Sequence, residues 1–151
     1  MKRFKFRFDA VEKVRRNREQ QVLRLLGASQ RDLEAAQARK RKLTERLATA
    51  LAAREKIGLQ SAYPADFGIS TDFIQGTKQR IIQADGAIAR AKRALEKATR
   101  VYLIARRQLR AIETLREKHH EEWKRERSKK EQKELDDLVI MRSFYLKGAE
   151  G

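Results

Sequence analysis

The residues best suited to bind a metal ion lie together in the second half of the 151-residue chain, in the run His119-His120-Glu121-Glu122. His119 and Glu122 are three positions apart, and that spacing places two side chains on one face of a helix. A catalytic zinc site needs three protein ligands, and the sequence contains no second cluster of ligands. We therefore interpret this run as a solvated rim rather than as a metal site.

The remaining candidates for catalysis are equally weak. Asp136-Asp137 is an acidic pair without a histidine or a glycine-rich loop nearby, and the sequence contains no phosphate-binding loop and no nucleophile elbow. The absence of cysteine excludes a disulfide scaffold, a thiolate zinc site and a thiol nucleophile. We predict that the protein is not an enzyme and that it uses no cofactor and no metal.

Basic residues strongly outnumber acidic ones, which limits the kinds of partner that the chain is suited to bind. Lys and Arg number 37 against 21 Asp and Glu, so the formal net charge is +16. Such charge suits nucleic acid, and it equally suits an acidic protein surface or channel. The basic residues are spread along the chain, and no aromatic residues that could stack on bases lie among them. We interpret the densest run, Arg39-Lys40-Arg41-Lys42, as a solvated helix face.

The sequence contains neither a membrane span nor a signal peptide. No stretch approaches the roughly 18 consecutive apolar residues that a span requires. The basic start of the chain is not followed by an apolar run of signal-peptide length. We therefore predict a soluble, cytosolic protein.

One cluster of helix-breaking residues divides the chain. Residues 58–72 contain the only proline, Pro64, and two glycines, and they end in Ser-Thr-Asp, which can cap a following helix. The sequence predicts a helix over about residues 8–58, a loop over 59–71 and a second helix over about 72–143. These elements are expected to form a single coiled-coil hairpin that spans residues 1–151.

Apolar residues in the second predicted helix recur at alternating steps of three and four residues, which is typical of a coiled-coil seam. The large row of this seam is Ile74, Ile81, Ile88, Leu95, Tyr102, Leu109 and Trp123, and the small row is Thr77, Ala84, Ala91, Ala98 and Ala105. Repeated alanines let a second helix approach closely. The predicted fold class is all-α, a long antiparallel two-helix coiled coil in which the C-terminal helix overhangs.

The first predicted helix has a rougher seam, in which several positions are basic. The seam begins with Phe8, Val11, Arg15, Arg18 and Val22. Long Arg and Lys stems can still cover apolar surface while their charged ends reach water. If the hairpin turns near Pro64, Phe8 lies opposite the region of Trp123. We therefore predict an aromatic clasp in which Phe4, Phe6 and Phe8 pack against Trp123.

The second helix, beyond Arg125, has no partner in its own chain. The last part of this overhang carries an apolar face made of Leu135, Leu138, Val139, Met141, Phe144 and Tyr145. One interpretation is a partner site, because an unsatisfied apolar face beside charge marks such sites. The alternative is a helix end that frays or folds back on Phe4 and Phe6.

Four short segments carry a resemblance to a known family. They are Phe4-Lys5-Phe6-Arg7-Phe8, Leu25-Leu26-Gly27, Phe73-Ile74-Gln75 and Glu131-Gln132-Lys133-Glu134-Leu135-Asp136-Asp137. The last is similar to a C-terminal Gln-Lys-x-x-Asp-Glu segment, with Asp137 where glutamate is usual. On these segments the chain resembles the FliJ family, a soluble component of the flagellar type III export apparatus.

The resemblance implies a non-enzymatic central stalk that couples the ring of the hexameric export ATPase (FliI) to the export gate protein (FlhA). It also implies handling of substrate chaperones, and a location in the cytoplasm at the inner face of the inner membrane. The residues implied to contact the ring are Phe4, Phe6, Phe8, Lys129, Lys130, Gln132, Lys133, Asp136 and Asp137. Leu43 and Phe73 are implied to contact the gate. Where other members carry aromatic residues near Leu43, this chain carries Arg46 and Ala50.

Two other functions remain open at this point. The related stalk protein of injectisomes shares the expected architecture, and a basic coiled coil also suits a scaffold or a nucleic-acid-binding protein. The oligomeric state is open as well, because the two helices can pair between chains instead of within one.

Overall fold

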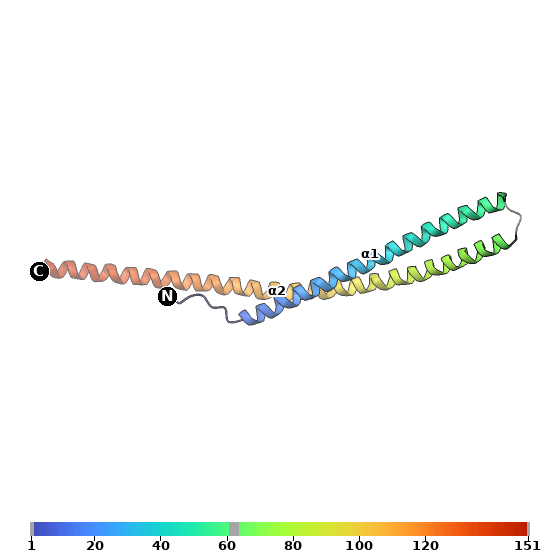
Figure 1. Ribbon diagram of the computed structural model, residues 1–151. Helices are drawn as coiled ribbons and strands as arrows, with labels where there is room; N and C mark the ends of the chain where they lie inside the picture. Colours follow the sequence, from blue (N-terminus) through green and yellow to red (C-terminus); the bar gives the residue numbers. More distant parts are fainter. Residues whose placement is uncertain (1, 61–63, 151) are drawn as a thin grey trace. The chain divides into compact units, whose positions relative to one another are not determined.

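The computed structural model of the protein describes residues 2–60 and 64–150. It consists of two helices, α1 (Asp9–Gln60) and α2 (Pro64–Ala149), and the described residues contain no strand (Figure 1). The two long helices pack against each other, so the predicted all-α helical hairpin is confirmed. No helix in the described part of the chain is long and apolar enough to cross a membrane.

The helices extend further than the sequence predicts. The expected loop over residues 59–71 is wrong for its outer parts, because α1 continues to Gln60 and α2 begins at Pro64. The centre of that loop, residues 61–63, lies outside the described residues. Proline is favourable at the first position of a helix, since its fixed φ suits the helix and its missing N–H has no helical acceptor there. Pro64 therefore begins α2, which also runs past residue 143 to Ala149.

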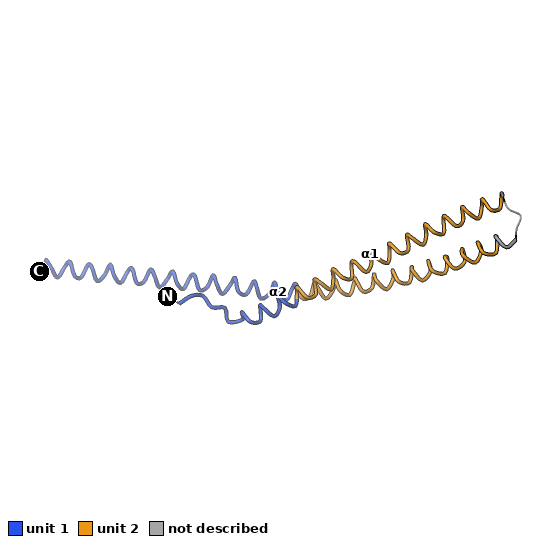
Figure 2. Tube along the Cα trace, viewed as in Figure 1, with its two compact units in different colours: residues 1–18, 106–151 blue, residues 19–105 orange. Residues whose placement is uncertain are grey.

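The chain divides into two compact units, which Figure 2 shows in different colours. Unit 1 contains residues 1–18 and 106–151, and unit 2 contains residues 19–105. Each unit takes one part from α1 and one part from α2. The prediction of a single domain over the whole chain stays a prediction.

In unit 2, residues 19–60 of α1 pack against residues 64–105 of α2. The buried apolar side chains are Val22, Leu43, Ile74, Ala84 and Ala105. Thr77 is also buried, and its hydroxyl donates a hydrogen bond to the Phe73 carbonyl at 2.8 Å, so its polar atom is satisfied inside the seam. The sequence prediction for α2 is confirmed here, since every predicted seam position from Ile74 to Ile112 is buried or half-buried.

Near the start of α1 the predicted seam is wrong at two of its five positions, Val11 and Arg18, and is confirmed at Phe8, Arg15 and Val22, which are buried or half-buried. Val11 and Arg18 are exposed, whereas their neighbours Glu12 and Glu19 are only 3% and 8% exposed. For Glu12 the reason is a basic residue on α2: Arg116 lies at the opposite seam position and binds the carboxylate. Glu12 therefore occupies the seam position that the sequence prediction had given to Val11.

Candidate functional site

The N-terminal phenylalanines form the predicted aromatic clasp with α2. Phe6 is 8% exposed and lies in a core with Leu109 and Ile112, and the half-buried Phe4 and Phe8 pack against that core. The predicted contact with Trp123 is confirmed for Phe4, whose ring centroid is 5.9 Å from that of Trp123, whereas Phe6 and Phe8 pack with Leu109 and Ile112 instead. We use the name aromatic clasp for residues 4–8 and the part of α2 between residues 109 and 123.

Backbone hydrogen bonds join the phenylalanine segment to α1. The amide of Asp9 donates to the Phe6 carbonyl at 3.3 Å, and the amide of Glu12 donates to the Phe8 carbonyl at 3.0 Å. These bonds satisfy amides in the first turn of α1 that would otherwise lack partners. The segment that carries the phenylalanines is thus held at the start of the helix, facing α2.

Both histidines of the candidate metal run belong to the clasp. His119 lies 5.7 Å from Phe6 and His120 lies 4.9 Å from Phe4, measured between ring centroids. His120 also stacks on Trp123 at 5.9 Å. Within residues 2–60 and 64–150, no group of three or more His, Cys, Asp or Glu is placed to hold a metal ion. These contacts give the histidines a packing role in the clasp.

A buried ion-pair network lies beside the phenylalanines. Glu12, whose side chain is only 4% exposed, accepts hydrogen bonds from Arg116 at 2.6 Å and from Arg16 at 3.0 Å. Arg116 also lies 3.6 Å from Asp9, and Arg16 lies 3.6 Å from Glu113. Burial of a carboxylate is tolerable when it is paired and hydrogen-bonded in this way. This network is not predicted from the sequence, although Glu12 and Glu19 are separated by the seven residues of a seam repeat.

The residues implied to contact an ATPase ring fall into two different environments. The three phenylalanines pack inside the chain, and Phe6 retains little exposed surface. The six polar residues lie further along α2, where all of them are exposed: Lys129, Lys130, Gln132, Lys133, Asp136 and Asp137. Only this polar set is free to meet another protein over its full side chains.

We refer to residues 125–149 of α2 as the tail. The tail is helical throughout, and every one of its residues is exposed. Near its start, Arg127 pairs with Glu131 at 2.9 Å and lies 5.5 Å from the centre of the Trp123 ring. None of the five charged residues in the polar set forms an ion pair with another described residue. Lys129 and Lys133, four positions apart, share one face of the helix.

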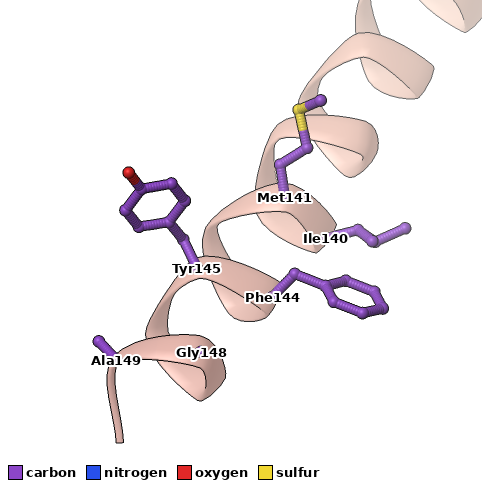
Figure 3. Close-up of a pocket in the computed structure, with 6 residues that line it drawn as sticks. All are labelled: Ile140, Met141, Phe144, Tyr145, Gly148 and Ala149. Carbon is purple, nitrogen blue, oxygen red and sulfur yellow. The ribbon is translucent and has the colours of Figure 1, made fainter. Parts of the chain in front are cut away.

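The apolar face of the tail lies against no other described part of the chain. Leu138, Phe144 and Tyr145 are 60%, 75% and 86% exposed. A hollow of about 730 Å³ on this face is lined by Ile140, Met141, Phe144, Tyr145, Gly148 and Ala149. Figure 3 shows how these residues lie on the helix. The alternative of a helix end folded back on Phe4 and Phe6 is wrong, since α2 continues to Ala149 and those two rings pack elsewhere.

The two residues implied to contact the gate lie in unit 2, in two adjoining grooves. Leu43 is 9% exposed and lines one groove between α1 and α2. Phe73 is 50% exposed and lines another, together with Thr49 and Ala50. Arg46 lines both grooves, so it lies where they meet. Leu43 and Phe73 therefore belong to one region of the unit but do not share a groove.

The described residues thus define a helical hairpin whose exposed charged and apolar surfaces suit contacts with other proteins. The chain matches the family described as "Flagellar FliJ protein" over residues 4–147. It belongs to the FliJ family, as its resemblance to that family predicted, and it is therefore a component of the flagellar type III export apparatus. Its partners belong to that apparatus. No curated protein and no solved structure matches the chain.

Proposed function

We propose that the protein is a stalk that couples the export ATPase ring (FliI) to the export gate (FlhA), and that it assists the handling of substrate chaperones. The observation that carries this proposal is the tail: a continuous helix with exposed charged and apolar residues that the chain itself does not use. A stalk of this kind works in the cytoplasm, at the inner face of the inner membrane.

In this proposal the tail enters the ring, and Lys129, Lys130, Gln132, Lys133, Asp136 and Asp137 contact its inner wall. The tail carries seven Lys and Arg against five Asp and Glu, so it contributes little to the net charge of +16. Ring binding therefore depends on a mixed pattern of charges and on the apolar hollow, and less on a general attraction between opposite charges. Phe4, Phe6 and Phe8 act from the clasp, where they hold the start of α1 against the helix that bears the tail.

The gate contact lies in unit 2, around Leu43 and Phe73. The half-exposed ring of Phe73 offers apolar surface to a partner, whereas Leu43 is nearly covered and supports the floor of its groove. Membership of the FliJ family favours the flagellar system over the injectisome stalk and over a nucleic-acid-binding coiled coil.

The test of the stalk proposal is a triple charge reversal on the tail, with Lys129, Lys130 and Lys133 changed to Glu. We expect the variant to retain its helicity, because the three lysines have no ion-pair partner among the described residues. We expect weaker stimulation of ATP hydrolysis by FliI and weaker binding to the ring. A chain truncated after Arg127 should lose both properties.

The matched control reverses three exposed lysines in unit 2: Lys56, Lys78 and Lys97. It changes the net charge by the same amount and leaves the tail intact. Equal loss of stimulation in both triple variants would mean that overall charge matters and that the tail has no special role. Full stimulation by the tail variant at low and moderate salt would refute ring contact by these lysines.

A further inference from the structure

Four arginines line one groove between the two helices of unit 2. Arg39 and Arg46 come from α1, and Arg80 and Arg90 come from α2. The groove has a volume of about 440 Å³, and its other lining residues are Leu43, Gln83, Ala84 and Ala87. We call it the arginine groove. None of its residues is acidic, so its walls are basic and its floor is formed by Leu43 and two alanines.

The four guanidinium groups have no counter-charge among the residues that the structure describes. None of the four arginines forms an ion pair or a hydrogen bond with another residue of 2–60 or 64–150. Another groove of unit 2 provides a contrast, because it contains Asp85, whose carboxylate binds Lys40 at 2.6 Å. In unit 2 the charge of Lys40 is thus neutralised by Asp85, whereas the four arginines of the arginine groove have no ion-pair partner among the described residues.

The spacing of the arginines follows the axes of the helices. Arg39 and Arg46 are seven residues apart, which corresponds to about 10 Å along α1, and Arg80 and Arg90 are about 15 Å apart along α2. The Arg90 guanidinium lies back along α2, with Nη1 3.5 Å from the position that a Cβ on Gly86 would occupy. The positive charge therefore forms two rows, one on each side of an apolar floor.

We propose that the arginine groove binds an acidic amphipathic helix of a partner protein. Carboxylates spaced by about seven residues on such a helix would lie about 10 Å apart and meet the guanidinium groups of Arg39 and Arg46 in register, and further carboxylates on its other side would meet those of Arg80 and Arg90. Small apolar residues on its inner face would cover Leu43, Ala84 and Ala87, as a third helix packs into the groove between two others. This proposal deepens the gate contact and rests on it for the identity of the partner.

The lining of the groove favours a protein helix over other polyanions. A nucleic acid would gain nothing from the apolar floor, and none of the lining residues is aromatic, so bases have no aromatic ring on which to stack. Arginine binds carboxylates as well as phosphates through paired hydrogen bonds. The apolar floor therefore favours the carboxylates of a protein helix over the phosphates of a nucleic acid.

The test measures binding of the full chain to a fluorescein-labelled helical peptide of about 21 residues, or three heptads. The peptide carries Glu in two rows and Leu and Ala on the inner face, and a second peptide has Gln in place of every Glu. We expect the Glu peptide to bind and the Gln peptide to bind at least about tenfold more weakly. Affinity should fall between about 50 and 150 mM salt, because salt screens charge.

Two double variants locate the binding. Arg46→Gln with Arg80→Gln, and separately Arg39→Gln with Arg90→Gln, should each weaken binding of the Glu peptide about tenfold. The matched control is Arg24→Gln with Arg31→Gln, which removes the same charge from exposed positions of unit 2 that lie outside the groove. An equal loss in the control would overturn the proposal. Circular dichroism checks that each variant keeps its helicity.

Duplex DNA and vesicles of phosphatidylglycerol serve as competing probes. If either binds the full chain more tightly than the Glu peptide does, and loses affinity in the groove variants, the proposal of a protein helix is wrong. Binding to FlhA and stimulation of FliI are measured in parallel. Normal binding to FlhA by both groove variants would refute the groove as part of the gate contact. If the unmodified chain does not bind FlhA at all, the proposed function itself is wrong.

Discussion

The aromatic clasp and the tail both take residues from α2 and both contain aromatic and charged side chains, yet these side chains differ in how much of their surface is exposed. In the clasp Phe6 is 8% exposed, and beside the clasp the side chain of Glu12 is 4% exposed. In the tail, Phe144 is 75% exposed and all the charged residues are exposed. Only the clasp has α1 and the N-terminal segment beside it.

This difference separates residues that stabilise the fold from residues that are available to partners. A buried phenylalanine or a paired buried carboxylate contributes to folding and is costly to replace. An exposed one contributes little to folding, so its presence in a helix that does not need it indicates another use. The comparison can be tested with matched substitutions in the two regions.

The largest difference is expected for phenylalanine. Phe6→Ala removes a buried ring from the core with Leu109 and Ile112 and should lower the free energy of unfolding by about 3 kcal/mol. Phe144→Ala should change it by less than about 0.5 kcal/mol, because the ring is exposed. Urea denaturation followed by circular dichroism measures both. Equal effects in the two variants would mean that the clasp is not part of the stable fold.

The second difference concerns carboxylates. Glu12→Gln leaves Arg116 and Arg16 without their shared buried partner, so we expect a loss of stability of about 2 kcal/mol. The figure lies below that for a fully buried pair because Arg116 is 44% exposed and water screens its charge. Glu126→Gln in the tail should be close to neutral. A neutral Glu12→Gln variant in the same urea experiment would show that the network adds nothing to stability.

The smallest difference concerns glycine, and it extends the comparison to the paired part of α2 in unit 2. A Cβ at Gly76 would meet no atom within 4 Å, so Gly76→Ala should raise stability by about 1 kcal/mol through helix propensity alone. Gly148 is equally unhindered but lies in the last turn of the tail. Since helix ends fray, Gly148→Ala should add less than about 0.3 kcal/mol. Thermal melting of both variants measures this, and a larger gain at Gly148 would show that the tail is more firmly folded than its exposure indicates.

Much of the fold could be predicted from the spacing of apolar residues. The seam of α2 repeats strictly, so its positions from Ile74 to Ile112 were predicted correctly. The start of α1 was predicted wrongly at Val11 and Arg18, because the buried seam positions there are occupied by the carboxylates Glu12 and Glu19. Burial of a carboxylate depends on a partner far away in the sequence, and here that partner is Arg116, 104 positions further on.

The candidate sites were predictable to different degrees. The exposed apolar face of the tail was predictable because the second helix is longer than the first and extends beyond it. Helix length and apolar periodicity are both properties of the sequence. The arginine groove could not be predicted, because Arg39 and Arg46 come together with Arg80 and Arg90 only when α1 and α2 pack in one particular register.

The sequence by itself determined three things: that the chain forms two long helices, which residues of α2 form the buried seam, and that the chain belongs to the FliJ family. Each of these depends on local spacing or on short motifs, which are present whether or not the chain is folded. Tertiary structure alone decided which charges are paired and which remain unpaired. Pairing depends on distances between two helices: in unit 1 Glu12 is paired with Arg116, whereas in unit 2 the four arginines of the arginine groove have no counter-charge among the described residues.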